Sequence, residues 1–274
     1  MIKIVCWSFL LLAGSYGLPL DSDVDTSMYF GNIDPVLIES SVAGPVPYMV
    51  AVTHGLAPRV LQCGASLITT RHFLTTAGCV YFTGESRRHL QGTVGTNLWN
   101  SGGTHYSVVR VIIHREYSIF TYKNDISILV TSSEVKLSEA VQPVVLNYDF
   151  IPAKVAAVVN GWGVTNVTEF KSPTMLMELQ TNIVDGKECA ADIADLAKKL
   201  KRPVHHVNPE LEICAFHSAK SGVCYGDGGS PLVLKENRQQ IGIVSWGIIC
   251  AKGVPDVYTR ISAFKSWIQK NTIL

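Results

Sequence analysis

Short apolar runs recur along the chain from Tyr48 onward, and glycine, asparagine, serine and proline separate them. Runs of this length bounded by turn-forming residues are typical of β-strands. Helical patterns do not alternate with these runs, which disfavours a parallel sheet joined by crossover helices. The clearest predicted strands are residues 48–52, 108–113, 126–130, 155–159 and 241–246.

Two segments instead repeat their apolar positions with helical spacing. The first covers residues 186–201. The second is the C-terminal segment, where Ile261, Phe264 and Ile268 share one face while Lys265 lies on another. Ser262 is the expected N-cap of this last helix.

The N-terminus has the pattern of an export signal. A basic start at Lys3 is followed by an apolar run over residues 4–13 and by the small residues Ser15 and Gly17. The run is too short to span a bilayer, so residues 1–17 are interpreted as a secretory signal peptide, with an uncleaved anchor as the alternative. Residues 18–35 are acidic and aperiodic and are interpreted as a leader or propeptide.

Composition narrows the class of protein. The chain has 274 residues, 23 Lys and Arg against 22 Asp and Glu, and a net charge of +1. Near-neutrality argues against a nucleic-acid binder, which needs a basic surface. A hydrophobic content of 47% with 16% charged residues excludes a disordered chain. Abundant glycine with few long charged runs favours an all-β fold.

Cysteine usage agrees with export. Cys6 falls in the signal segment, which leaves an even number of cysteines, and this implies disulfides in a secreted chain. Six cysteines allow 15 pairings, and their spacing does not select one. No CxxC pair occurs, so metal binding is not expected. The six are Cys63, Cys79, Cys189, Cys214, Cys224 and Cys250.

Three motifs in order identify a resemblance. They are CGASLI at 63–68 followed by LTTAGC at 74–79, NDISIL at 124–129, and CYGDGGSPL at 224–232. GWG at 161–163, SWG at 245–247 and PDVYTR at 255–260 support them. From about residue 36 to the C-terminus, the chain resembles the chymotrypsin-like serine proteases, particularly their insect members.

The resemblance implies an all-β fold for residues 36–274: two packed six-stranded antiparallel β-barrels with a C-terminal α-helix. It also implies one set of disulfides, namely Cys63–Cys79, Cys189–Cys214 and Cys224–Cys250.

The sequence departs from the family where catalysis occurs. Family members use a Ser-His-Asp triad. Gly78 stands where the histidine is expected and Gly228 where the nucleophile is expected, so only the acid remains, as Asp125. Ser230 lies two residues beyond the nucleophile position, about 7 Å along an extended chain, and a nucleophile must approach within about 3.5 Å. Asp125 is therefore expected to be a structural acid bonded to backbone groups.

A second departure concerns activation. Family zymogens are cut after a basic residue, and the new ammonium pairs with the aspartate before the nucleophile. No Lys or Arg lies between Lys3 and Arg59. Asp227 is therefore expected to be solvated or hydrogen-bonded, as in a zymogen, unless a non-tryptic enzyme processes the chain.

Part of a ligand-binding cleft remains in the sequence. The resemblance implies a backbone anion site at Gly226 and Gly228. It also implies a specificity pocket in which Asp256 adjoins the base and attracts a Lys or Arg side chain. The alternative is that Asp256 turns towards solvent or a backbone group. The positions matching the pocket walls are Gly222, Val223, Ser245, Trp246 and Gly247.

Two surface features complete the set of candidates. Lys198, Lys199, Lys201 and Arg202 form a dense basic run that could bind an anionic glycan, although a solvated helix face is the simpler interpretation. Asn166 begins the only glycosylation sequon. Neither a metal nor a cofactor is expected.

These observations predict a secreted, catalytically inactive serine protease homologue that acts by binding a protein partner or a protease inhibitor, with no nucleic acid and no membrane span. One alternative is a residual hydrolase with unorthodox catalytic groups. Another is a cationic glycan-binding or antimicrobial protein that resembles azurocidin.

Overall fold

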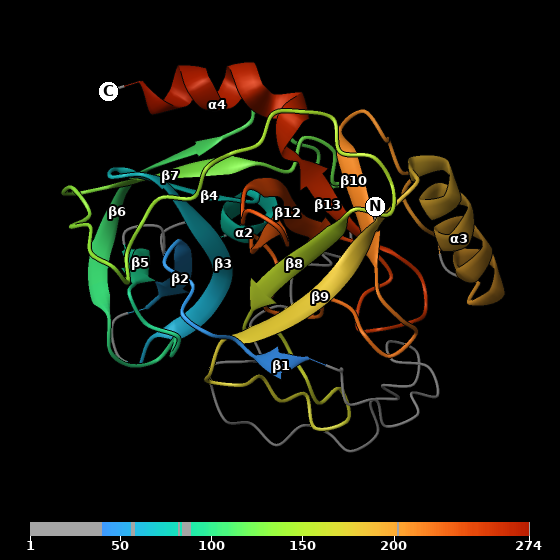
Figure 1. The fold of residues 1–274 in the computed structure, drawn as a ribbon, viewed down its shortest axis with the longest axis horizontal. Helices are drawn as coiled ribbons and strands as arrows, with labels where there is room; N and C mark the ends of the chain where they lie inside the picture. The colour runs from blue at the N-terminus through green and yellow to red at the C-terminus, as the bar shows by residue number, and fades with distance from the viewer. Residues whose placement is uncertain (1–39, 56–57, 82, 84–88, 202, 274) are drawn as a thin grey trace, which may run out of the picture. The chain divides into compact units, whose positions relative to one another are not determined.

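The computed structural model describes residues 40–55, 58–81, 83, 89–201 and 203–273. The predicted signal peptide at 1–17, the leader at 18–35 and Arg202 lie outside these residues. Figure 1 shows two groups of strands, blue to green in the first half of the chain and yellow to red in the second.

The first half of the chain forms a closed barrel in the order β2-β3-β4-β7-β6-β5. Its strands are antiparallel, and β2 closes the barrel by pairing with both β3 and β5. The strands are β2 (Met49–His54), β3 (Val60–Thr69), β4 (His72–Thr75), β5 (Gln91–Val94), β6 (Thr104–Ile113) and β7 (Ser127–Thr131).

The packing around strand β2 explains why apolar and polar residues do not alternate in its sequence. Val50 and Val52 point into the core of the first barrel. Met49 and Ala51 point the other way and pack with Trp162 from the second half of the chain. Both faces are therefore buried over residues 49–52, and all four of these positions are apolar.

The second half forms the sheet β1-β9-β10-β13-β12-β11-β8, and a further pairing of β8 with β9 closes its last six strands into a second antiparallel barrel. Strand β1 lies at its edge, paired with β9. The strands are β1 (Ser41–Val42), β8 (Ala156–Gly161), β9 (Met177–Val184), β10 (Glu212–Phe216), β11 (Pro231–Leu234), β12 (Gln240–Trp246) and β13 (Asp256–Arg260). The two six-stranded barrels confirm the predicted fold.

Helices α3 (Gly186–Lys199) and α4 (Lys265–Thr272) lie outside the barrels (Figure 1). Asp185 caps α3 (Gly186–Lys199) by accepting the N–H groups of Lys187 and Glu188. The C-terminal segment begins as a 3₁₀ turn, η2 (Ile261–Phe264), and continues as α4 (Lys265–Thr272). The expectation that Ser262 caps it is wrong, because Ser262 lies inside the 3₁₀ turn and neither helix start has a side-chain cap.

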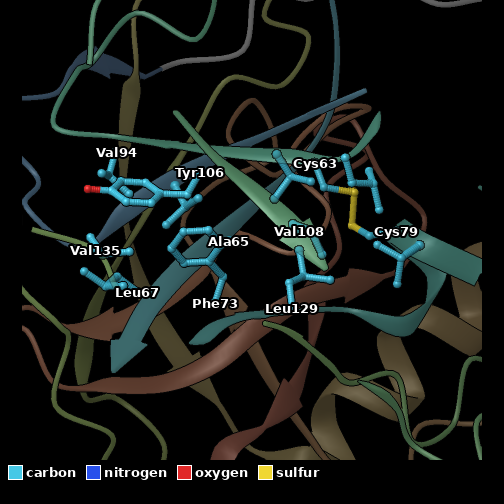
Figure 2. Packing of buried hydrophobic residues seen from close by; sticks show 14 of the residues in the cluster. Cys63, Ala65, Leu67, Phe73, Cys79, Val94, Tyr106, Val108, Leu129 and Val135 are labelled. Atoms are coloured by element: carbon cyan, nitrogen blue, oxygen red, sulfur yellow. A yellow bond between two sulfur atoms is a disulfide. The ribbon is translucent and has the colours of Figure 1, made fainter. Parts of the chain in front are cut away.

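Apolar side chains join the two barrels and fix the segments between them. Leu74 and Ile128 of the first barrel pack with Ile243 of the second and with Ile261 and Phe264 of the C-terminal segment. Figure 2 shows the core of the first barrel, where Phe73 and Leu129 lie beside the disulfide. The three disulfides are Cys63–Cys79, Cys189–Cys214 and Cys224–Cys250, the pairing that the family resemblance implies.

Candidate functional site

The candidate site is built around Asp125, which precedes β7. Oδ1 of Asp125 accepts the backbone N–H of Gly78 at 2.8 Å, and Oδ2 accepts the hydroxyl of Ser245 at 2.6 Å. Thr259 donates to the Asp125 carbonyl at 2.7 Å. Segments from both barrels therefore converge on one carboxyl group that is only 2% exposed.

Burial raises the pKa of Asp125 to about 6, although the hydrogen bonds from Ser245 and Gly78 oppose this rise. Taking a carboxylate out of water disfavours its charged form, and two hydrogen bonds offset only part of that cost. Asp125 is therefore held in a fixed position by donors of the chain itself.

Gly78 lies in the short helix α2 (Ala77–Tyr81), which Cys79 ties to Cys63 in β3. A Cβ atom at Gly78 would lie 3.2 Å from Tyr117 Oη and 3.6 Å from Asp125 Oδ1. A side chain at this position would thus project directly beside the carboxyl group. Tyr117 was not identified from the sequence, since nothing in its neighbourhood marks it as part of a site.

Gly228 lies in the turn that precedes β11. Its carbonyl accepts the N–H of Gly64 at 3.0 Å, and Cys79 Sγ lies 3.4 Å from the same oxygen. A Cβ atom at Gly228 would find only Cys79 Sγ, at 3.9 Å, within 4 Å. The structure therefore brings Gly228 next to Cys79, the sequence neighbour of Gly78, and leaves room for a small side chain at Gly228.

Asp227 is hydrogen-bonded to backbone groups. Oδ1 accepts the N–H of Gly163 at 2.8 Å, and Oδ2 accepts the N–H of Cys224 at 2.9 Å. Burial raises the pKa of Asp227 to about 6 against these hydrogen bonds. Its partners in the described chain are thus N–H groups, with no ion pair among the same residues.

Gly161 and Gly163 leave the space that the Asp227 carboxyl group fills, because a Cβ atom at either glycine would overlap it. A cavity of about 30 Å³ adjoins the carboxyl group and is also lined by Gly222 and Val223. The GWG motif therefore fits closely around Asp227.

The predicted specificity pocket brings Asp256 to Gly222 and Val223. Asp256 Oδ2 accepts the N–H of Val223 at 2.9 Å and lies 3.1 Å from the place of a Cβ atom at Gly222. A Cβ atom at Gly247 would lie 3.8 Å from Asp256 Cα. Asp256 thus faces the pocket segment and bonds to its backbone.

Burial raises the pKa of Asp256 to about 8, and the nearby Asp227 raises it further while the Val223 N–H opposes the rise. A buried carboxyl group without a cation prefers to be protonated. A cationic side chain placed beside it would favour ionisation, so this pocket can exchange a proton for a cation.

Trp246, the other predicted pocket residue, is held by a buried ion pair. Its indole N–H donates to Glu212 Oε1 at 2.6 Å, and Lys123 Nζ lies 2.7 Å from both carboxylate oxygens of Glu212. The Lys123 ammonium also lies 4.8 Å from the centroid of the Trp246 ring. Sequence reasoning missed Lys123 and Glu212 because they are 89 residues apart.

The remaining candidates lie on the surface. Lys198, Lys199 and Lys201 are exposed at the end of α3. Asn166 is half-buried in a turn where its Oδ1 accepts the N–H of Glu169 at 3.0 Å. Ser230 is fully buried, and its hydroxyl makes no hydrogen bond.

Metal sites and membrane-spanning helices are two further kinds of feature that the described residues could contain. In that part of the chain, no group of three or more His, Cys, Asp or Glu side chains could hold a metal ion. None of the helices described there is long and apolar enough to cross a membrane.

Two barrels with a retained acid between them define the chymotrypsin-like class of folds. The family described as Trypsin matches residues 36–268. The chain is 34% identical to Chymotrypsin-2 of Vespa crabro over 84% of its own length and 96% of the relative's. It is 32% identical to Trypsin delta of Drosophila erecta, covering 77% and 78% of the two chains, and 30% identical to Trypsin of Sarcophaga bullata, covering 82% and 83%. The chain belongs to the trypsin family.

Proposed function

We propose that this chain is a secreted, non-catalytic serine protease homologue that acts by binding. The observation that carries the proposal is that Gly78, at the position where the family places its general base, has no side chain, although a Cβ atom there would lie 3.6 Å from Asp125 Oδ1. Gly228 likewise offers no nucleophile. Loss of the serine or histidine from such a triad lowers turnover on the order of 10⁶-fold, and a second loss adds little.

Neither Ser230 nor His72 is placed to replace the missing nucleophile or general base. Ser230 has no exposed surface. His72 is buried in β4 with Nδ1 2.7 Å from Thr69 Oγ1, so its ring belongs to the barrel wall. The backbone donors alone would leave roughly 10³–10⁴-fold acceleration over water, which is too slow for digestion or a cascade.

Binding does not require the missing groups, because the affinity of a protein inhibitor comes from shape complementarity and fixed contacts rather than from the nucleophile. Two hydrogen bonds support a fixed binding surface here, one from Val223 N–H to Asp256 and one from the Trp246 indole to Glu212. We infer that the partner is a protein with a substrate-like loop, such as a protease inhibitor.

Titration of a substrate-like trypsin inhibitor tests this proposal. Two forms of the inhibitor, with Lys or Leu at the residue that enters the pocket, are compared by calorimetry on the wild type and on Asp256→Asn. We expect binding, a preference for the Lys form, and loss of that preference in the variant. Binding of both forms weaker than millimolar would exclude the inhibitor as partner.

The main rival is a residual hydrolase. A peptidase assay on the recombinant wild type and on Asp125→Ala distinguishes a residual hydrolase from a non-catalytic protein. Equal background rates support the absence of catalysis, whereas a rate that depends on Asp125 would contradict it.

Export is part of the proposal. Three disulfides favour an oxidising compartment, and the sequence of residues 1–17 favours a cleaved signal. N-terminal sequencing of the protein recovered from culture medium tests both. Mass spectrometry of the same sample tests whether Asn166 carries a glycan.

A second candidate function is glycan binding through the exposed lysines at the end of α3. Cations gathered at the C-terminal turn of a helix also complement its dipole, so a stabilising role competes with this one. Salt-sensitive retention on an anionic column, lost when Lys198, Lys199, Lys201 and Arg202 are neutralised, would favour the glycan.

A further inference from the structure

The turn at residues 164–171 contains the sequon that begins at Asn166. Asn166 and Lys171 pair across this turn as an antiparallel bridge, in which Lys171 N–H donates to the Asn166 carbonyl at 3.0 Å. Thr165 N–H donates to the Lys171 carbonyl at 3.2 Å. The backbone of Asn166 is therefore held in a fixed place by the two sides of the turn.

Two contacts join this turn to Tyr225. Val164 N–H donates to the Tyr225 carbonyl at 2.8 Å, and the centroids of the Phe170 and Tyr225 rings lie 5.3 Å apart. Asn166 is two residues from Val164, which is about 7 Å along an extended chain. Its bridge partner Lys171 is the sequence neighbour of Phe170. Both sides of the turn thus hold Asn166 close to Tyr225.

Tyr225 lies at the edge of the cleft to which we assign the protein partner. In the sequence it stands between Val223, whose N–H donates to Asp256, and Gly226 of the predicted backbone anion site. Tyr225 is 47% exposed and Phe170 is 54% exposed. A stable protein interface covers about 800 Å² on each partner, so a protein that inserts a loop towards Asp256 would also cover this aromatic pair.

The Asn166 side chain presents its nitrogen, the atom that carries the sugar in an N-linked glycan, to solvent. Oδ1 accepts the N–H of Glu169 at 3.0 Å, whereas Nδ2 donates no hydrogen bond within the described chain. Nδ2 is also not one of the buried unpaired side-chain atoms in that part of the chain, so it is accessible. Thr168, the third residue of the sequon, is exposed as well. A glycan at Asn166 would therefore extend outwards without disturbing the fold.

We propose that Asn166 carries an N-linked glycan which stands beside the Tyr225 edge of the cleft and hinders large protein partners, while small ligands still reach the pocket. A partner that covers Tyr225 must hold this bulky group aside, and ordering a flexible group at an interface lowers the affinity. The inference rests on the proposed function, because it concerns the partner that binds the same cleft.

Three proteins secreted from insect cells are compared: the wild type, Thr168→Ala and Thr168→Ser. Thr168→Ala removes the sequon but keeps Asn166 and its contact with Glu169, whereas Thr168→Ser keeps the sequon as well. We expect mass spectrometry to find the glycan only on the wild type and on Thr168→Ser. In calorimetry with a substrate-like trypsin inhibitor, Thr168→Ala should bind about tenfold tighter than the other two. Enzymatic removal of the glycan from the wild type should give the same gain.

A short cyclic peptide with the sequence of the inhibitor's reactive loop tests the dependence on size. We expect all three proteins to bind this peptide with equal affinity, because it reaches the pocket without covering Tyr225. An unmodified Asn166 in the secreted wild type would overturn the proposal, as would equal inhibitor affinity with and without the glycan or a tenfold gain for the peptide in Thr168→Ala. Failure of every form to bind the inhibitor, Thr168→Ala included, would instead contradict the proposed function itself.

Discussion

Gly78 donates its backbone N–H to Asp125 Oδ1 over 2.8 Å. The carboxyl group that the family resemblance assigns to the triad acid is thus bonded directly to the chain at the position that the same resemblance assigns to the base. Ser245 holds the second oxygen at 2.6 Å, so two donors of the chain itself fix the carboxyl group. In the proposed non-catalytic homologue, this acid keeps its position while glycine replaces the histidine and the serine.

Restoring a histidine at position 78 and a serine at position 228 tests whether these two side chains are sufficient to restore catalytic reactivity. Gly228→Ser meets only Cys79 Sγ at 3.9 Å, whereas Gly78→His requires Tyr117 Oη to move slightly from 3.2 Å. We expect both variants to fold. Only the double variant should react with a fluorophosphonate probe, because a serine without a base is not activated. Labelling of the Gly228→Ser single variant at the same rate would mean that another group acts as base.

The pH dependence of stability should report Asp256. Its pKa is raised to about 8 by burial, so between about pH 4 and about pH 8 the native state holds a proton that the unfolded state has lost. Stability therefore falls as pH rises through this window, by up to about 1.4 kcal/mol per pH unit. Asp125 and Asp227 contribute only up to about pH 6, and the lowered pKa values of His72 and His114 act in the opposite direction below about pH 7. Comparison with Asp256→Asn therefore isolates Asp256.

Urea unfolding of the wild type and Asp256→Asn at pH 6, 7 and 8 measures this difference. The variant should show the shallower slope and gain stability relative to the wild type as the pH rises. Parallel curves would contradict the assignment of a protonated Asp256.

The glycine at position 163 should be intolerant of a side chain. A Cβ atom there would overlap the Asp227 carboxyl group, whereas a Cβ atom at Gly44 meets nothing within 4 Å. We expect Gly163→Ala to cost about 1–3 kcal/mol through overpacking and Gly44→Ala to change stability little. Thermal unfolding of both variants checks the contrast, and equal melting temperatures would show that Asp227 can move aside.

Removing only one partner of the Lys123–Glu212 ion pair beside Trp246 should lower the free energy of unfolding. Lys123→Met leaves Glu212, which is 4% exposed, without its cation, and we expect a loss of about 3 kcal/mol in the free energy of unfolding. The double variant Lys123→Met, Glu212→Gln should regain much of this loss, because no unpaired charge remains and the Gln amide oxygen can still accept the Trp246 N–H. Near-ultraviolet circular dichroism would follow the Trp246 indole. Additive losses in the double variant would contradict a coupled pair.

Several elements followed directly from local pattern. The run at 48–52 corresponds to β2 and the run at 241–246 to β12, while the helical repeat at 186–201 corresponds to α3. Ser262 failed as a cap because the turn begins at Ile261, two residues earlier than a cap at Ser262 requires, and Ile261 and Phe264 of this turn pack in the core. Local patterns thus predicted where elements lie better than how they begin.

The sequence by itself determined the order of the motifs, the identity of the residues at positions 78, 125 and 228, and the apolar runs that form strands. These depend on chain neighbours and on residue type. Only the tertiary structure decided that Ser245 bonds to Asp125, that Lys123 pairs with Glu212, and that Asp256 turns to Val223. These contacts join residues between 33 and 120 positions apart, where no local periodicity links one partner to the other. They form because closing two barrels against each other buries these polar groups together and leaves each to find its partner across the interface or within its own barrel.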